Sequence, residues 1–148
     1  MSSSILKLNE VSIIQENKKV LTEVNIEIGN GDFVYLIGRT GSGKTSLIKT
    51  LYADLKLQFG TGSIVDIELK KLKEEEIPLL RRKLGIVFQD FKLLSDRSVS
   101  ENLKFVLKAT GWEDESKINS RITEVLEKVH ITELINKYPS QLSGGEQQ

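Results

Sequence analysis

The sequence predicts an α/β fold with a mixed sheet, in which an antiparallel β portion comes first and a helical subdomain last. Two segments within residues 6–28 alternate apolar and polar side chains, which is typical of half-buried strands. An apolar run at residues 33–37 leads through a glycine-rich loop into a segment of helical spacing. Beyond residue 100, apolar residues recur at the spacing of amphipathic helices.

The first two predicted strands are residues 6–13 and 20–28. Val24, Ile26 and Ile28 share one face of the second strand. A polar, turn-like stretch separates the strands, and the sequence Gly-Asn-Gly-Asp at residues 29–32 is a strong turn signal after them. We therefore expect an antiparallel pair that leads into a buried strand at residues 33–37.

The glycine-rich loop that follows has the spacing of a phosphate-binding loop. Residues 38–45 read Gly-Arg-Thr-Gly-Ser-Gly-Lys-Thr, and the expected strand before them and helix after them supply the context that this motif needs. A chance glycine-rich turn before a helix would lack that context. The sequence therefore predicts a nucleotide-binding site at this loop.

Each residue type in the loop has a physical reason. Glycines let backbone N–H groups approach a β-phosphate without obstruction by a Cβ atom. Lys44 can reach the β- and γ-phosphates, and Thr45 can place its hydroxyl on Mg²⁺. The residues expected to bind the nucleotide are Gly38, Arg39, Thr40, Gly41, Ser42, Gly43, Lys44, Thr45 and Ser46.

The rest of the chain is expected to continue with short elements and then helices. We expect the helix after the loop to end between residues 54 and 60, a turn at 61–63 and a short strand at 64–67. Pro78 suits the first turn of a helix, and residues 86–88 are expected to form a second buried strand. Further helices are predicted at 101–109, 117–129 and 131–135. The predicted domains are a nucleotide-binding core with the antiparallel β portion at 1–88 and a helical subdomain at 89–148.

Composition limits the possible partners. The 21 basic and 21 acidic side chains balance, so nothing favours nucleic acid as an electrostatic partner. There is no cysteine, which excludes disulfides and thiolate metal sites. We see neither signal-peptide features at the start nor an apolar run long enough to span a bilayer, so we expect a cytoplasmic chain that reaches a membrane only through a partner.

Gln89 and the terminal sequence Leu-Ser-Gly-Gly-Glu-Gln-Gln at residues 142–148 resemble the Q-loop and signature motif of ATP-binding subunits of ABC (ATP-binding cassette) transporters. The resemblance implies an ABC-type P-loop ATPase fold with ATP and Mg²⁺ as cofactors. It gives Lys44 and Gln89 catalytic roles, and it places Thr45 and Gln89 beside the metal. It also implies a nucleotide-sandwich homodimer, in which Ser143, Gly144 and Gly145 cap the γ-phosphate held by the second ATP-binding subunit.

Residues 76–82 and 88–99 resemble the cell-division branch of that family, whose ATP-binding subunit pairs with an integral membrane subunit, the FtsX-type protein. The resemblance implies a peripheral position at the inner face of the cell membrane. The lipoprotein-release or macrolide-export branches and a soluble ABC-type regulator without a membrane partner are the alternatives. A small P-loop kinase would need a phosphate-acceptor pocket that the sequence does not supply.

The sequence departs from the family pattern in two places. Ile14 and Gln15 stand where the family usually has an aromatic residue for adenine stacking, so we expect weaker base stacking. The sequence also stops at the signature, before the acidic (Walker B) strand, the catalytic glutamate and the switch histidine of the family. We therefore expect a fragment of a longer protein, inactive in hydrolysis by itself, whose full-length parent hydrolyses ATP.

Overall fold

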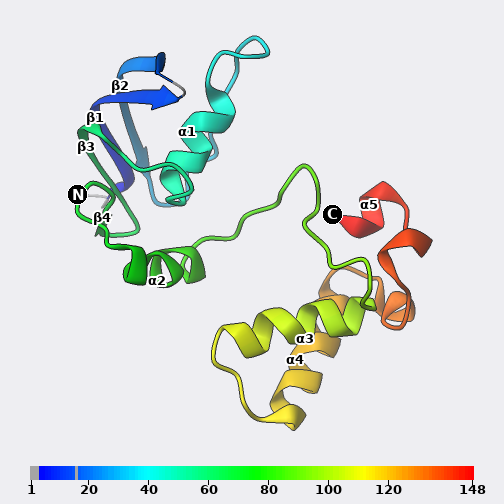
Figure 1. The fold of residues 1–148 in the computed structure, drawn as a ribbon. Coiled ribbons are helices and arrows are strands. Elements are labelled where there is room, and N and C mark those ends of the chain that lie inside the picture. The colour runs from blue at the N-terminus through cyan, green and yellow to red at the C-terminus, as the bar shows by residue number, and fades with distance from the viewer. Residues whose placement is uncertain (1–3, 16) are drawn as a thin grey trace. The chain divides into compact units, whose positions relative to one another are not determined.

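The computed structural model describes residues 4–15 and 17–148, and it divides the chain into two compact units. We call Met1–Gly85 the sheet unit and Ile86–Gln148 the helical unit. Figure 1 shows strands only in the first of them and helices as the main elements of the second. Each unit is described by itself.

The sheet unit contains a four-stranded sheet in the order β2-β1-β3-β4. Its strands are β1 (Ser4–Gln15), β2 (Lys18–Gly29), β3 (Phe59–Ile64) and β4 (Ile67–Glu68). All three pairings are antiparallel. The predicted antiparallel pair is therefore confirmed, with Leu8 opposite Ile26 on β2 and opposite Gly62 on β3.

A bulge in β1 explains how this strand buries residues that do not strictly alternate. Leu8 and Val11 are both buried, although they are three residues apart, and the register shifts between them. Glu10 takes a positive φ of 51°, and its N–H donates to the Asn25 Oδ1 atom at 2.9 Å. The extra residue restores the phase of the strand, so the apolar side chains before and after it face the same core.

Two helices and one 3₁₀ turn complete the sheet unit: α1 (Lys44–Leu51), η1 (Glu74–Glu76) and α2 (Ile77–Arg82). Pro78 lies in the first turn of α2, as the sequence predicted. Leu47 of α1 and Leu80 of α2 are buried in one cluster with β1. The buried members of this core are Leu6, Leu8, Val11, Ile13, Leu47, Leu57, Leu69 and Leu80.

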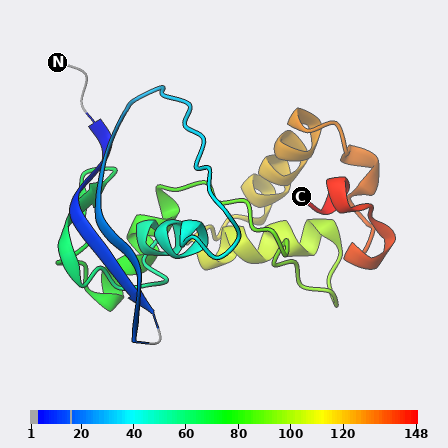
Figure 2. The ribbon, with the colours of Figure 1, turned by 90° about the horizontal axis from the view of Figure 1, so that it is seen from above.

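The run at residues 33–37 does not form the buried strand that the sequence predicted. Phe33 is 82% exposed and Ile37 is 87% exposed. In Figure 2 the segment between β2 and α1 is a long arc without regular structure. No strand among the described residues pairs with it, so its backbone N–H and C=O groups have no ladder to join.

Four other expectations were wrong in detail. Residues 64–67, expected as one short strand, form the tight turn between β3 and β4, with Val65 and Asp66 both at positive φ. Residues 86–88 form no strand, and Val87 is 68% exposed, because no described strand pairs with them either. Residues 61–63 belong to β3 and do not form a turn, since they pair with β1. Helix α1 ends at Leu51, earlier than expected, where the Tyr52 N–H closes the last turn on the Ile48 carbonyl.

The helical unit packs two amphipathic helices, α3 (Val99–Ala109) and α4 (Glu115–Lys128). Ile118, Ile122 and Leu126 of α4 form its buried core, as their helical spacing predicted. Leu103 and Leu107 of α3 pack against that core, whereas Val106 lies mostly exposed. The unit ends with η2 (Thr132–Leu134), η3 (Pro139–Gln141) and α5 (Gly144–Gln147).

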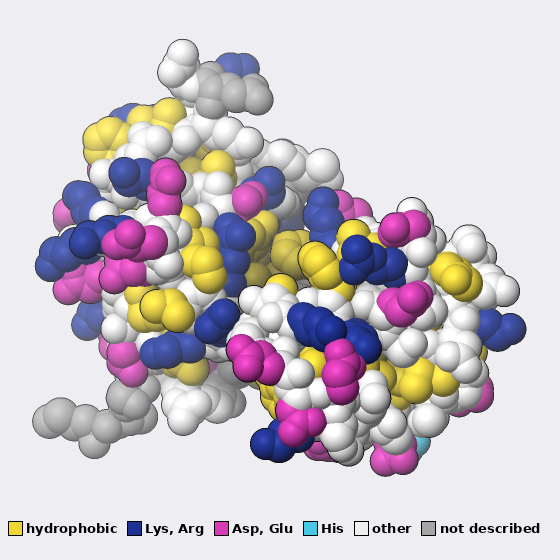
Figure 3. Space-filling view, turned by 60° about the horizontal axis from the view of Figure 1, so that its bottom comes forward, with side chains coloured by type: hydrophobic (Ala, Val, Ile, Leu, Met, Phe, Trp, Pro, Cys, Tyr) yellow, Lys and Arg dark blue, Asp and Glu magenta, His cyan; other side chains and the backbone are white. Residues whose placement is uncertain are grey.

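Lysine, arginine and acidic side chains are interspersed on the face shown in Figure 3, as the balanced composition predicts. None of the helices in the described part of the chain is long and apolar enough to cross a membrane.

Candidate nucleotide-binding site

The glycines of the predicted phosphate loop are required by its backbone. Gly41 and Gly43 have φ values of +79° and +88°, in the left-handed region that side chains disfavour. Gly38 has an ordinary φ, but a Cβ there would lie 2.7 Å from the Ser42 Oγ atom. A side chain is therefore strained at Gly41 and Gly43, whereas at Gly38 it would require only the Ser42 hydroxyl to move.

Lys44 holds the loop in its curled form. Its Nζ atom donates to the Gly38 carbonyl at 2.7 Å and to the Arg39 carbonyl at 2.8 Å. The Ser42 N–H donates to the same Arg39 carbonyl at 3.1 Å, which closes a tight turn. The ammonium charge is thus fixed at the centre of the loop, where an incoming phosphate would meet it.

The α1 helix, like α2, has no side-chain cap at its N-terminus. Gly43 is its N-cap and has no side chain with which to accept a hydrogen bond. By contrast, Ser98, Asp114 and Ser143 cap α3, α4 and α5 through their side-chain oxygens. The first-turn N–H groups of α1 are therefore left to a ligand, and the positive end of the helix dipole favours an anion there.

A hollow of about 300 Å³ lies at this helix end. It is lined by Gln15, Val20, Gly41, Gly43, Lys44, Thr45 and Ser46. Ser46 is buried and donates its hydroxyl proton to the Gln15 Oε1 atom at 2.9 Å, whereas Thr45 is exposed. The end of β1 and the phosphate loop thus share one polar hollow. Its size is at the lower end of the range for small-molecule sites.

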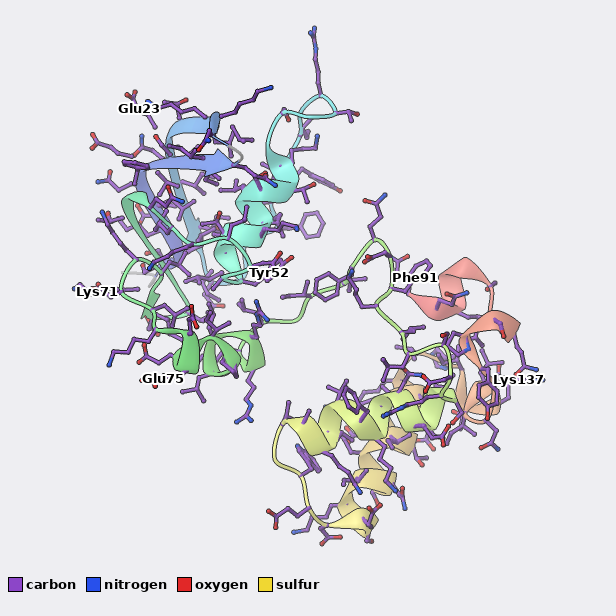
Figure 4. All side chains as sticks on the ribbon, viewed as in Figure 1. Glu23, Tyr52, Lys71, Glu75, Phe91 and Lys137 are labelled. Carbon is purple, nitrogen blue, oxygen red and sulfur yellow. The ribbon has the colours of Figure 1, made fainter. Side chains whose placement is uncertain are left out.

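Gln89 lies in the helical unit, on an exposed turn. The chain after it is bent sharply, since Phe91 and Lys92 both have positive φ values, of 53° and 55°. Figure 4 shows the Phe91 side chain on the side of α5, and its ring would lie 4.0 Å from a Cβ added at Gly144. The segment after Gln89 and the start of the signature helix are therefore neighbours within this unit.

The signature segment begins α5 with a closed capping box. The Ser143 N–H donates to the Glu146 carboxylate at 2.6 Å, and the Glu146 N–H donates to the Ser143 hydroxyl at 3.4 Å. Hydrogen bonds to the Glu146 carboxylate from the Ser143 hydroxyl, and secondly from the Ser143 N–H, lower the pKa of Glu146 below its usual value. Gly144 and Gly145 are exposed, and no atom lies within 4 Å of a Cβ built at Gly145. The backbone of these two glycines is therefore exposed at the start of α5.

The match to protein families decides between classes of nucleotide-binding protein. A model of the ABC transporter family matches residues 21–148, which is most of the chain and includes the loop, Gln89 and the signature. The chain belongs to the ABC transporter family. The resemblance to the ABC family is thereby confirmed, and so is the α/β fold of the ABC ATPase type.

Relatives and solved structures within the ABC transporter family are similar over nearly the whole chain. The cell division ATP-binding protein FtsE of Streptococcus pneumoniae is 37% identical over 98% of this chain and 63% of its own length. The methionine import ATP-binding protein MetN of Helicobacter pylori is 38% identical over 97% of this chain and 44% of its own length. A solved structure of the ATP-binding cassette MJ0796, a dimer bound to ADP and phosphate, is also similar. The TM-score is 0.81 and the sequence identity is 30%, and the match covers 96% of this chain and 65% of the MJ0796 chain.

The present chain spans less than two thirds of the length of these ABC transporter proteins. The structure brings the residues 38–46 of the predicted site together around Lys44. It places Gln89 and residues 143–145 in the helical unit, each within its own local surroundings.

Sequence reasoning missed two contacts. The hydrogen bond between Gln15 and Ser46 joins positions that are far apart in the chain, and no local pattern indicates it. Asn102 is the other case: its side chain is buried and bonds the backbone of Leu94, Arg97 and Ser98. A polar residue on the inner side of an amphipathic helix was the available signal for Asn102.

Proposed function

We propose that the full-length protein is an ABC-type ATPase subunit that binds and hydrolyses ATP. The observation that carries this proposal is the curled loop around Lys44 beside the uncapped N-terminus of α1. Membership of the ABC transporter family and the similarity to a cassette bound to ADP and phosphate support it.

The site offers hydrogen-bond donors for the phosphates of a nucleotide and a hydroxyl oxygen for Mg²⁺. In the described part of the chain there is no group of three or more His, Cys, Asp or Glu side chains that could hold a metal. Mg²⁺ is often held by few protein ligands together with phosphate oxygens, and the Thr45 hydroxyl at the hollow fits that pattern. When bound, Mg²⁺ neutralises charge on the phosphates. Gln89 is proposed to act on the metal side, and Lys44 to orient and neutralise the β- and γ-phosphates.

We further propose that two copies form the active unit. Ser143, Gly144 and Gly145 would then face the γ-phosphate held by the other copy. The exposed glycine backbone at the start of α5 has room for such an anion. The similarity to a dimeric cassette supports this arrangement.

The proposed setting is FtsE-like: a cytoplasmic subunit held at the inner face of the cell membrane by an FtsX-type integral membrane protein in cell division. The similarity to FtsE supports this setting, and that to MetN supports the alternative of an import transporter. Leu93 is partly exposed after Gln89, and Asn102 fixes the next residues to α3. We propose that this anchored segment, with Phe91 and Leu94, docks on the membrane subunit.

Replacing Lys44 tests the central proposal. Lys44→Ala removes the charge at the centre of the loop, and a charge-assisted hydrogen bond contributes about 1.5–3 kcal/mol. ATP affinity of the full-length protein, measured by calorimetry, should therefore fall at least about tenfold. Lys49→Ala is the matched control, because Lys49 lies on the same helix but pairs with Asp54 at 3.1 Å. Equal ATP affinity of wild type and Lys44→Ala would remove the loop from the proposed mechanism.

A further inference from the structure

We infer that Asn102 is a positioning residue that holds the segment after Gln89 and the signature segment in one hydrogen-bonded block. The inference rests on the proposed function, because it concerns how these two segments are held for hydrolysis. Asn102 lies in the first turns of α3, its side chain is buried, and it does not line the hollow at the phosphate loop.

The Asn102 carboxamide closes the loop that precedes α3 onto the helix. Its Oδ1 atom accepts from the Leu94 N–H at 2.8 Å. Its Nδ2 atom donates to the carbonyls of Leu94, Arg97 and Ser98, each at 3.0 Å. The partners fix the orientation of the amide, because a backbone N–H can only donate and a carbonyl can only accept. A side chain without both ends of the amide could not make the same set of bonds.

The first turn of α3 is also bonded to the chain that leads into the signature. The Val99 N–H donates to the Lys137 carbonyl at 2.9 Å, and the Ser100 N–H donates to the Ile135 carbonyl at 3.0 Å. A helix cannot satisfy these first N–H groups by itself, so residues 135–137 serve as their partners. One turn of α3 therefore holds the loop after Gln89 through a side chain and the approach to the signature through its backbone.

The two segments also meet directly. The Phe91 ring lies on the side of α5, 4.0 Å from a Cβ added at Gly144 (Figure 4). A membrane subunit docked on the segment after Gln89 would therefore displace α3 and the signature together, through contiguous bonds. Without the Asn102 carboxamide, Leu94 loses both of its hydrogen bonds to α3, and the loop could move while the signature stayed in place.

Variants of the full-length protein separate this role from a general effect on the stability of α3. Asn102→Ala removes the bonds to the loop, whereas Ser98→Ala removes the N-cap of the same helix and leaves the bonds to Leu94 in place. Asn102→Ser is a second test, because a serine hydroxyl in a helix can bond the carbonyl four residues earlier, here that of Ser98, but is too short to hold Leu94. It keeps the local bond and releases the loop.

Hydrogen exchange and ATPase kinetics give two independent readouts. Exchange of the Leu94 amide should become at least about tenfold faster in Asn102→Ala and Asn102→Ser and stay near the wild-type rate in Ser98→Ala. The kcat for ATP should fall at least about tenfold in both Asn102 variants, because misplaced catalytic groups lower the rate of the chemical step. Their ATP affinity by calorimetry should stay within about twofold of wild type, since the phosphate loop lies in the sheet unit.

Three outcomes would overturn the inference. They are an unchanged kcat in the Asn102 variants, an equal fall of kcat in Ser98→Ala, and an unchanged exchange rate of the Leu94 amide. A loss of ATP affinity as large as the loss of kcat would also overturn it, because Asn102 would then act on folding and not on position. A wild type that neither bound nor hydrolysed ATP would be a failure of the proposed function itself, so the two failures are distinguishable.

Discussion

Replacing Gly43 by alanine should destabilise the sheet unit more than the same change at Gly41. Both residues lie in the phosphate loop with positive φ, at +88° and +79°. They differ in what surrounds them. A Cβ at Gly43 would lie 2.8 Å from the Leu21 Cγ and Val20 Cγ1 atoms, whereas no atom lies within 4 Å of a Cβ at Gly41.

The expected magnitudes follow from these surroundings. A left-handed backbone costs a residue with a Cβ about 1–2 kcal/mol, and this cost applies to both variants. The overlap with β2 at Gly43 is an overpacking cost of about 1–3 kcal/mol in addition. We therefore expect a loss of about 1–2 kcal/mol for Gly41→Ala and of about 2–5 kcal/mol for Gly43→Ala.

Hydrogen exchange of the backbone amides that join β1 to β2 measures this difference. These amides report on the free energy of opening of the sheet unit alone, so the helical unit does not enter. Protection should fall more in Gly43→Ala than in Gly41→Ala. Equal losses would refute the packing of the loop against β2 while leaving the backbone argument intact, and no loss in either variant would refute both.

Three further predictions concern other parts of the chain. Under the proposed function, Leu93→Asp should abolish co-purification of the full-length protein with the proposed membrane subunit while ATP binding persists. Val129→Asp, at another exposed apolar position of the helical unit, should leave co-purification intact. Loss of folding in Leu93→Asp would instead make Leu93 a core residue. Glu124 has its pKa lowered to about 2, chiefly by its hydrogen bond with Lys128, so its contribution to stability is present above pH 4.5 and is lost as pH falls toward 2. Acid unfolding of Glu124→Gln should lack that component, and an identical pH profile would contradict the ion pair. Residues 1–148 alone should release no phosphate from ATP above the level of the Lys44→Ala blank. The full-length protein should release phosphate above that level. If residues 1–148 showed Lys44-dependent turnover, one of their own carboxylates would have to act as the base, and Asp90 would be the first to test.

The sequence was sufficient to predict the elements whose burial follows from their own periodicity. The β1–β2 pair and helix α4 bury the apolar residues that their alternation and helical spacing indicate. The bulge at Glu10 was not predicted, because it involves a hydrogen bond from the Glu10 N–H to the Asn25 side chain on the neighbouring strand. The runs at 33–37 and 86–88 have strand composition, but a strand forms only where a partner supplies its hydrogen bonds.

At the candidate site, too, what could be predicted depends on how far apart in the sequence the contacting residues lie. The phosphate loop could be predicted because its stabilising bonds are local: Lys44 bonds the carbonyls of Gly38 and Arg39, a few residues earlier in the chain. Gln15 could not be assigned a role in this way, since its contact with Ser46 crosses 31 residues and exists only once β1 and α1 have packed together.

The location of these contacts, within one unit or the other, also bears on how the site would work. The hydrogen bonds that hold the phosphate loop all lie inside the sheet unit. Gln89 and the signature residues belong to the helical unit, which has its own core. Its signature helix is capped by Ser143 in a capping box with Glu146. Under the proposed function, binding and hydrolysis therefore place different demands on the protein. ATP binding depends first on the phosphate loop of the sheet unit, whereas hydrolysis also requires Gln89 and the signature residues of a second copy at the same phosphate. A membrane subunit that acts on the helical unit could therefore control hydrolysis without changing ATP binding.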